Sequence, residues 1–61
     1  MNSEKERKDI SAIVRYTDAF VFPSGVYGNI EVLRGGSMKE IQERAEQTAK
    51  ANHVEVAAIT E

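Results

Sequence analysis

The chain has 61 residues, a formal net charge of −2 and no cysteine, which limits it to one small domain and excludes disulfides and thiolate metal sites. It has one histidine, His53, so a metal site built from several histidines is excluded as well. A domain of this size buries only about 60% of its unfolded surface. Since disulfides and such metal sites are excluded, we expect association with another chain to supply stability. We expect no cofactor and no metal.

The first nine residues are charged, of mixed sign, and have no apolar side chain after Met1. Such a segment buries too little surface to compensate for the entropy lost on ordering. We therefore predict a disordered tail over residues 1–9 and a single domain over residues 10–61, with a helical extension ordered by a partner as the alternative for the tail. The polar start lacks the apolar core of a signal peptide, and no apolar run reaches 18 residues. We expect a cytoplasmic protein that does not enter a membrane.

From Ile10 onward the chain alternates between apolar and polar positions, which is typical of a strand with one buried face. Asp18 interrupts the apolar positions, so we expect a bend or a bulge there. The side chains of the predicted buried face are those of Ile10, Ala12, Val14, Tyr16, Phe20 and Phe22.

Residues 23–25, with the sequence Pro-Ser-Gly, form the strongest turn signal in the chain, since proline presets the second position of a turn and glycine suits its exit. They predict a hairpin in which Phe22 pairs with Val26 and a second strand runs from Val26 to about Arg34.

This pairing places Tyr16 opposite Val32 and Phe20 opposite Gly28, where the ring of Phe20 is expected to cover the glycine. The register is favoured because a shift of one residue would scatter the apolar set over both faces. The set that it gathers on one face is Val14, Tyr16, Phe20, Phe22, Val26, Ile30 and Val32.

Ser37 and Glu40 match a capping box, so a helix is predicted from there to Ala51 or Asn52, with Asn52 in the left-handed conformation at its exit. Its apolar stripe is narrow and rich in alanine. The last predicted strand, residues 54–60, has no charge after Glu55, which indicates a central or well-covered strand.

The order of elements predicts an α+β fold: a single small β-β-α-β domain whose three-stranded sheet is covered on one face by one helix. We place the first strand in the middle of the sheet. We expect the connection from the second strand to the third to be right-handed.

The sequence offers little for catalysis. His53 is the one candidate general base, and its place at the helix end indicates a capping or surface residue. No catalytic motif is present, so we predict no enzymatic activity. A weak anion-binding or enzymatic alternative rests on the glycine-rich segment before the helix, whose residues are Arg34, Gly35, Gly36, Ser37 and Lys39.

The face of the hairpin opposite the predicted core is too apolar for a solvated surface, and no element remains to cover it. We therefore predict a non-catalytic protein-interaction module that uses this face or an open sheet edge, with a second copy of the chain as the expected partner. The predicted partner-binding residues are Ile13, Arg15, Val21, Tyr27 and Leu33.

The alternative is a small nucleic-acid-binding module with a local basic and aromatic patch. Its candidate residues are Arg15, Tyr27, Arg34 and Lys39. The negative net charge argues against nucleic acid as the partner, because phosphate backbones are bound by clusters of basic side chains.

Overall fold

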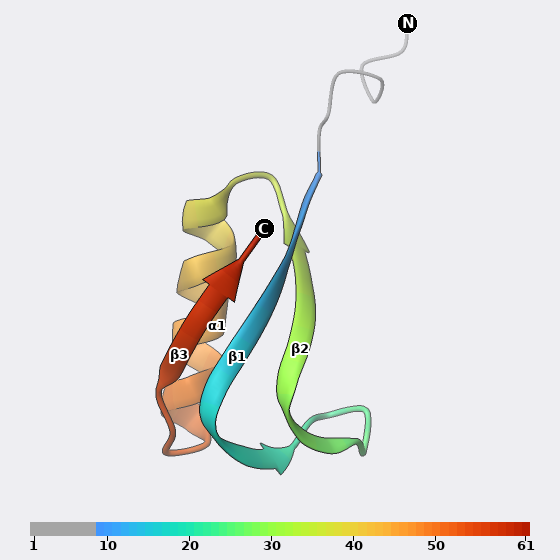
Figure 1. Ribbon diagram of the computed structural model, residues 1–61, viewed down its shortest axis with the longest axis vertical. Helices are drawn as coiled ribbons and strands as arrows, with labels where there is room; N and C mark the ends of the chain where they lie inside the picture. The colour runs from blue at the N-terminus through green and yellow to red at the C-terminus, as the bar shows by residue number, and fades with distance from the viewer. Residues whose placement is uncertain (1–8) are drawn as a thin grey trace, which may run out of the picture.

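The computed structural model describes residues 9–61, so residues 1–8 of the predicted tail lie outside the described part of the chain. Its elements are β1 (Ile10–Val21), β2 (Tyr27–Gly35), α1 (Met38–Ala51) and β3 (Val56–Thr60). The predicted α+β fold and its β-β-α-β order are confirmed (Figure 1). No helix in the described range is long and apolar enough to cross a membrane.

The sheet has the order β2-β1-β3, which confirms the predicted central position of the first strand. Both neighbours run antiparallel to β1, so β2 and β3 are parallel to each other. The chain passes from one to the other through α1, which lies behind the sheet in Figure 1 and gives the connection its expected right hand. β3 is an edge strand, so of the two alternatives for the last strand the central one is wrong; Val56 and Ile59 are partly buried against the core.

The hairpin turn forms as predicted. The amide of Gly25 donates to the carbonyl of Phe22 over 2.8 Å, and the amide of Phe22 donates to the carbonyl of Val26 over 2.8 Å. Gly25 has a φ of 92°, a conformation that costs glycine little and other residues more. The turn therefore fixes the pairing of the residues beside it.

The predicted register holds only near the turn. There Val21 pairs with Tyr27 and Phe20 with Gly28, but farther along Ile13 pairs with Val32. Between these stretches β1 contributes residues 16–19, where β2 contributes only Asn29. This large bulge shifts the pairing by an odd number of residues, and an odd shift moves every later side chain of β2 to the opposite face.

The gathering of Ile30 and Val32 on the core face is consequently wrong, because both side chains are exposed. Val26 is also exposed. The pairing of Phe20 with Gly28 is correct, but a Cβ at Gly28 would meet nothing within 4 Å, so the ring does not cover the glycine.

The bulge is held on both sides of β1. The side-chain amide of Asn29 donates to the carbonyl of Tyr16 over 3.1 Å. On the other side, the amide of Thr17 donates to the carbonyl of Glu55 over 2.9 Å, and the amide of Glu55 donates to Thr17 Oγ1 over 3.1 Å. These bonds satisfy backbone groups that the interrupted ladder would leave unpaired.

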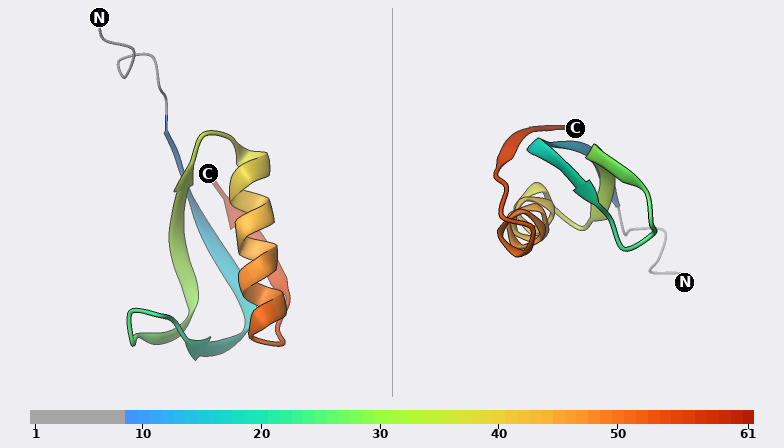
Figure 2. Two further views of the ribbon diagram at one scale, coloured as in Figure 1. Left: turned by 180° about the vertical axis from the view of Figure 1, so that it is seen from behind. Right: turned by 90° about the horizontal axis from the view of Figure 1, so that it is seen from below.

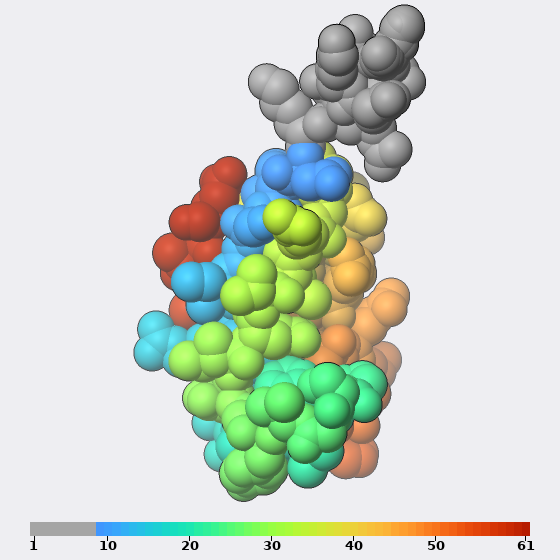
Figure 3. All heavy atoms as spheres, turned by 90° about the vertical axis from the view of Figure 1, so that its right-hand side faces the viewer, coloured from blue at the N-terminus to red at the C-terminus, as the bar shows by residue number. Residues whose placement is uncertain are grey.

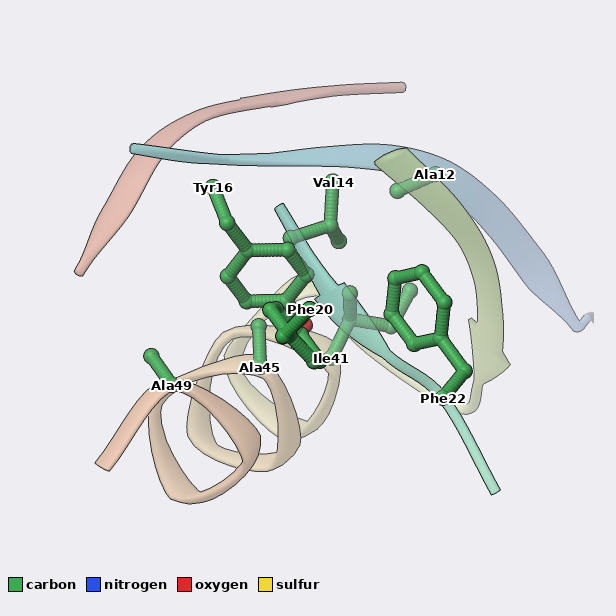
Figure 4. Packing of buried hydrophobic residues seen from close by; sticks show 8 residues of the cluster. All are labelled: Ala12, Val14, Tyr16, Phe20, Phe22, Ile41, Ala45 and Ala49. Carbon is green, nitrogen blue, oxygen red and sulfur yellow. The ribbon is translucent and has the colours of Figure 1, made fainter. Parts of the chain in front are cut away.

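The bend places three aromatic rings between the sheet and α1 (Figure 4). The ring centroids of Tyr16 and Phe20 lie 5.1 Å apart at an interplanar angle of 72°, and those of Phe20 and Phe22 lie 4.6 Å apart. The alanines of α1 let the helix lie close to these rings. The buried residues of this core are Ala12, Val14, Tyr16, Phe20, Phe22, Ile41, Ala45 and Ala49.

The start of α1 is capped by the predicted pair. Ser37 Oγ accepts from the amide of Glu40 over 3.2 Å, while Glu40 Oε1 accepts from the amide of Gly36 over 2.9 Å. In a capping box the carboxylate returns to the cap residue itself; here it reaches one residue farther back.

The left-handed residue at the helix exit is His53, with a φ of 60°, rather than Asn52. The amides of His53 and Val54 donate to the carbonyls of Lys50 and Ala49, over 3.3 and 2.9 Å. This pattern is a Schellman motif. His53, which the sequence indicated as a capping or surface residue, therefore ends the helix through its backbone conformation.

Candidate interaction surface

The side of the sheet that faces away from α1 carries no other described element, as the end-on view in Figure 2 shows. We call it the outer face. Strand pairing arranges its side chains in three rows. From β2 across β1 to β3, these rows are Ile30–Arg15–Ala58, Val32–Ile13–Thr60, and Arg34–Ser11 with no described partner on β3.

Three large aliphatic side chains lie together in this arrangement. Ile13, Ile30 and Val32, which we call the aliphatic cluster, are 50%, 55% and 62% exposed. Ile13 and Val32 are direct cross-strand neighbours, whose Cβ atoms lie about 5 Å apart. Ile30 is two residues from Val32 on the same strand, about 7 Å away. The aliphatic cluster therefore forms an apolar patch that is exposed to solvent.

An arginine stands at each end of the aliphatic cluster. Arg15 is opposite Ile30 in the first row, and Arg34 is in the third row, about 13 Å farther along the strands. The Nε atom of Arg34 donates to Ser11 Oγ over 3.2 Å, which holds the guanidinium across the face towards β1. Figure 3 shows the molecule from the edge of the sheet formed by β2, so that β1 lies on one side of β2 and α1 lies on the other.

The predicted partner-binding residues divide into three groups. Ile13 and Arg15 lie on the outer face as expected. Val21 and Tyr27 are 60% and 71% exposed, but they pair with each other on the turn side of the bulge, outside the three rows. Leu33 was expected on the outer face and is instead half-buried against the core.

Ile30 and Val32 belong to the outer face and were missed by sequence reasoning. The signal that would have found them is a buried hydroxyl. Tyr16 is 1% exposed, and its hydroxyl donates to Glu31 Oε2 over 2.6 Å. Since a buried hydroxyl requires a partner, Glu31 has to face the core side, and its neighbours Ile30 and Val32 then face outward.

This hydrogen bond also has an electrostatic consequence. Burial raises the pKa of Tyr16 above its ordinary value, and the hydrogen bond to Glu31 and its negative charge raise that pKa further. The tyrosine therefore stays neutral and continues to donate at ordinary pH. Glu31 is thus kept on the core side, away from the arginines of the outer face.

The residues of the predicted anion site do not converge on one point. The amide of Gly36 already donates to Glu40, and the carbonyl of Arg34 accepts from Arg44 Nη1. The guanidinium of Arg34 lies on the outer face, bonded to Ser11, whereas Lys39 belongs to α1. The glycine-rich segment thus has a helix-capping role, with a carboxylate in the place that an external anion would take.

The nucleic-acid candidates are also dispersed. Tyr27 and Arg34 stand at opposite ends of β2, about 23 Å apart by strand rise. Lys39 lies in the first turn of α1. Only Arg15 and Arg34 share a surface, and the side chains between them are aliphatic rather than aromatic, so they offer no platform on which bases stack.

Two shallow depressions lie elsewhere, and neither combines the groups that catalysis needs. The larger, of about 360 Å³, is lined by Glu46, Ala49, Lys50, Val54, Glu55 and Val56. The smaller, of about 270 Å³, lies on α1 and is lined by Glu43, Glu46, Gln47 and Lys50. Within residues 9–61 no three side chains of the metal-binding types come together.

Comparisons with known proteins give no match: no family model, no curated protein and no solved structure resembles this chain closely enough to count.

Proposed function

We propose that this domain is a non-catalytic protein-interaction module that binds a protein partner through the outer face. The observation that carries the proposal is the aliphatic cluster, three β-branched side chains at least half exposed on the β1 and β2 part of an uncovered sheet face. Contiguous exposed apolar surface of this kind marks interaction sites. The small core adds support, because a domain that buries few side chains gains much from covering such a face.

The remaining surface supports the same proposal. The depressions beside α1 contain carboxylates and a lysine, and His53 is used to end the helix. A nucleophile needs an activating base within reach, and the described residues offer no such pair.

Site-specific photo-crosslinking in the cells that make the protein tests this function. A photoreactive phenylalanine analogue replaces Val32 on the outer face in one variant and Gln42 on the exposed side of α1 in a matched control. We expect adducts of defined mass from position 32 and none from position 42. An adduct of twice the chain mass would identify a second copy as the partner, as predicted from the sequence; any other mass would identify a different protein.

A further substitution checks that the adducts report on the face itself. Ile13→Glu places a negative charge beside position 32 and should abolish the adducts while leaving the fold intact, since Ile13 is half exposed. Equal adduct patterns from positions 32 and 42, or adducts that survive Ile13→Glu, would contradict the proposal.

A further inference from the structure

We infer that the occupant of the outer face is an acidic amphipathic helix of a protein partner, an inference that rests on the function proposed above. Its basis is the combination of an aliphatic cluster with an arginine at each end. An apolar stripe alone would accept many partners, whereas charges at its margins select one sign.

The charges of the domain are separated between its surfaces. Residues 9–61 carry five basic and eight acidic side chains. Two of the five basic side chains, Arg15 and Arg34, lie in the three rows of the outer face, and none of the eight carboxylates does. The described part of the chain is therefore acidic as a whole and basic in the three rows of the outer face. Such a face attracts an acidic partner and repels a basic one.

A second copy fits this face less well. A two-fold axis brings the same patch from both subunits together, so two more guanidinium groups would enter the interface and no carboxylate of the three rows would meet them. The first nine residues of the chain are also a poor complement, because their three basic and three acidic side chains sum to zero. We therefore assign the matching negative charge to a protein partner.

The separations between side chains on the outer face match those along one side of an α-helix. The opposite face of the same sheet is already covered by α1, so this sheet accepts a helix packed against it. Residues four apart on a helix are separated by about 6 Å along its axis, close to the separation of Ile30 and Val32 on their strand. Glutamates eight apart are separated by about 12 Å, close to the distance between the rows of Arg15 and Arg34.

A designed peptide provides the first test. The probe is a helical peptide with two leucines four residues apart on one face and two glutamates eight residues apart beside them; the matched peptide has lysine in place of each glutamate. Both are titrated into the full ¹⁵N-labelled chain while amide resonances are followed. We expect the glutamate peptide to shift the amides of β1 and β2 in the three rows, and the lysine peptide to leave those rows unchanged.

Charge reversal provides the second test. Arg15→Glu with Arg34→Glu should weaken binding of the glutamate peptide by about tenfold, since two attractive contacts become repulsive, and should make the lysine peptide the tighter ligand. The matched control, Lys39→Glu with Lys50→Glu, changes the total charge equally but on α1, and should leave the preference unchanged.

Other outcomes overturn the inference. These are equal affinity for the two peptides, shifts confined to α1, or no shift in the three rows. A concentration-dependent dimer that is abolished by Ile13→Lys, or binding through these rows to phosphatidylserine vesicles or mixed oligonucleotides rather than to the glutamate peptide, would also overturn it. Position-specific cross-links from residue 32 would still support a protein-binding face in those cases, so failure of this inference is distinguishable from failure of the proposed function.

Discussion

The two faces of the sheet are built from alternate residues of the same strands and have opposite properties. On the side of α1, Val14 and Tyr16 are almost fully buried, and the one hydroxyl of that core has a carboxylate partner. One residue away on the outer face, Ile13 and Arg15 are exposed to solvent. Apolar content alone therefore does not separate the two faces. They differ in whether an element of the chain covers them.

One set of side chains therefore stabilises the fold, and a separate set is available for the proposed function. Residues under α1 provide the burial that stabilises the domain, at about 25 cal/mol per Å² of apolar surface. The side chains of the aliphatic cluster stay at least half exposed in the isolated chain, so this surface is available to a partner.

The centre of the covered face should be the most sensitive position. Ile41 is fully buried, so Ile41→Ala removes packed methyl groups and leaves a cavity, which should lower the free energy of unfolding by about 2–4 kcal/mol. Urea denaturation measures the loss. Gln42→Ala, the next residue on the exposed side of α1, is the control and should change stability by less than about 0.5 kcal/mol. Equal losses would mean that the core lies elsewhere.

The hydrogen bond between Tyr16 and Glu31 should have the next largest effect. Tyr16→Phe keeps the ring but leaves the half-buried carboxylate of Glu31 without its donor, which should cost about 1–3 kcal/mol in unfolding free energy. Tyr27→Phe is the matched control, because Tyr27 is 71% exposed, and should be neutral.

The same variant changes the dependence of stability on pH. The pKa of Tyr16 is raised above 10 in the folded protein, so its contribution is complete below pH 10 and is lost as pH rises above that value. The slope reaches about 1.4 kcal/mol per pH unit, because the unfolded chain releases a proton that the folded chain retains. Tyr16→Phe should lose less stability than the wild type on this alkaline side. Parallel curves for the two proteins would contradict the burial of the hydroxyl.

The smallest effect is expected at the end of the helix that covers the core. His53 has a positive φ, which glycine adopts without the steric cost that other residues meet. His53→Gly should therefore raise the melting temperature, with a gain of about 0.5–1 kcal/mol. Asn52→Gly should lower it, because the side-chain amide of Asn52 donates to the carbonyl of Thr48 over 2.8 Å. A loss of stability from both substitutions would show that His53 contributes more than backbone geometry.

Much of the fold could be predicted from local chemistry. The turn at residues 23–25, the cap at Ser37 and the helix that follows each depend on neighbours in sequence, and each forms as expected. The central place of the first strand was also predicted correctly, on the ground that it is the longest of the three strands.

The outer face could be predicted only in part, because its composition depends on pairing between distant residues. The odd and even positions of β2 are about equally apolar, so periodicity does not choose between them. The choice is made by a bulge opposite Asn29 and by the hydrogen bond between Tyr16 and Glu31. Both join residues far apart in sequence, so the periodicity of one strand does not report them. Assigning Leu33 outward and Val32 inward followed from extending the hairpin register through the bulge.

The most direct test of the separation between the two faces is one pair of identical substitutions. Val→Thr keeps the shape and the preference for strands, so Val14→Thr on the covered face and Val32→Thr on the outer face differ only in their surroundings. Their free energies of unfolding should be measured in urea at low protein concentration. The structure predicts a loss of about 1–3 kcal/mol for Val14→Thr, whose hydroxyl would be buried without a partner, and a change within about 0.5 kcal/mol for Val32→Thr. A loss at Val32 as large as that at Val14 would contradict the account, because it would show that the outer face is already covered and is not free for a partner.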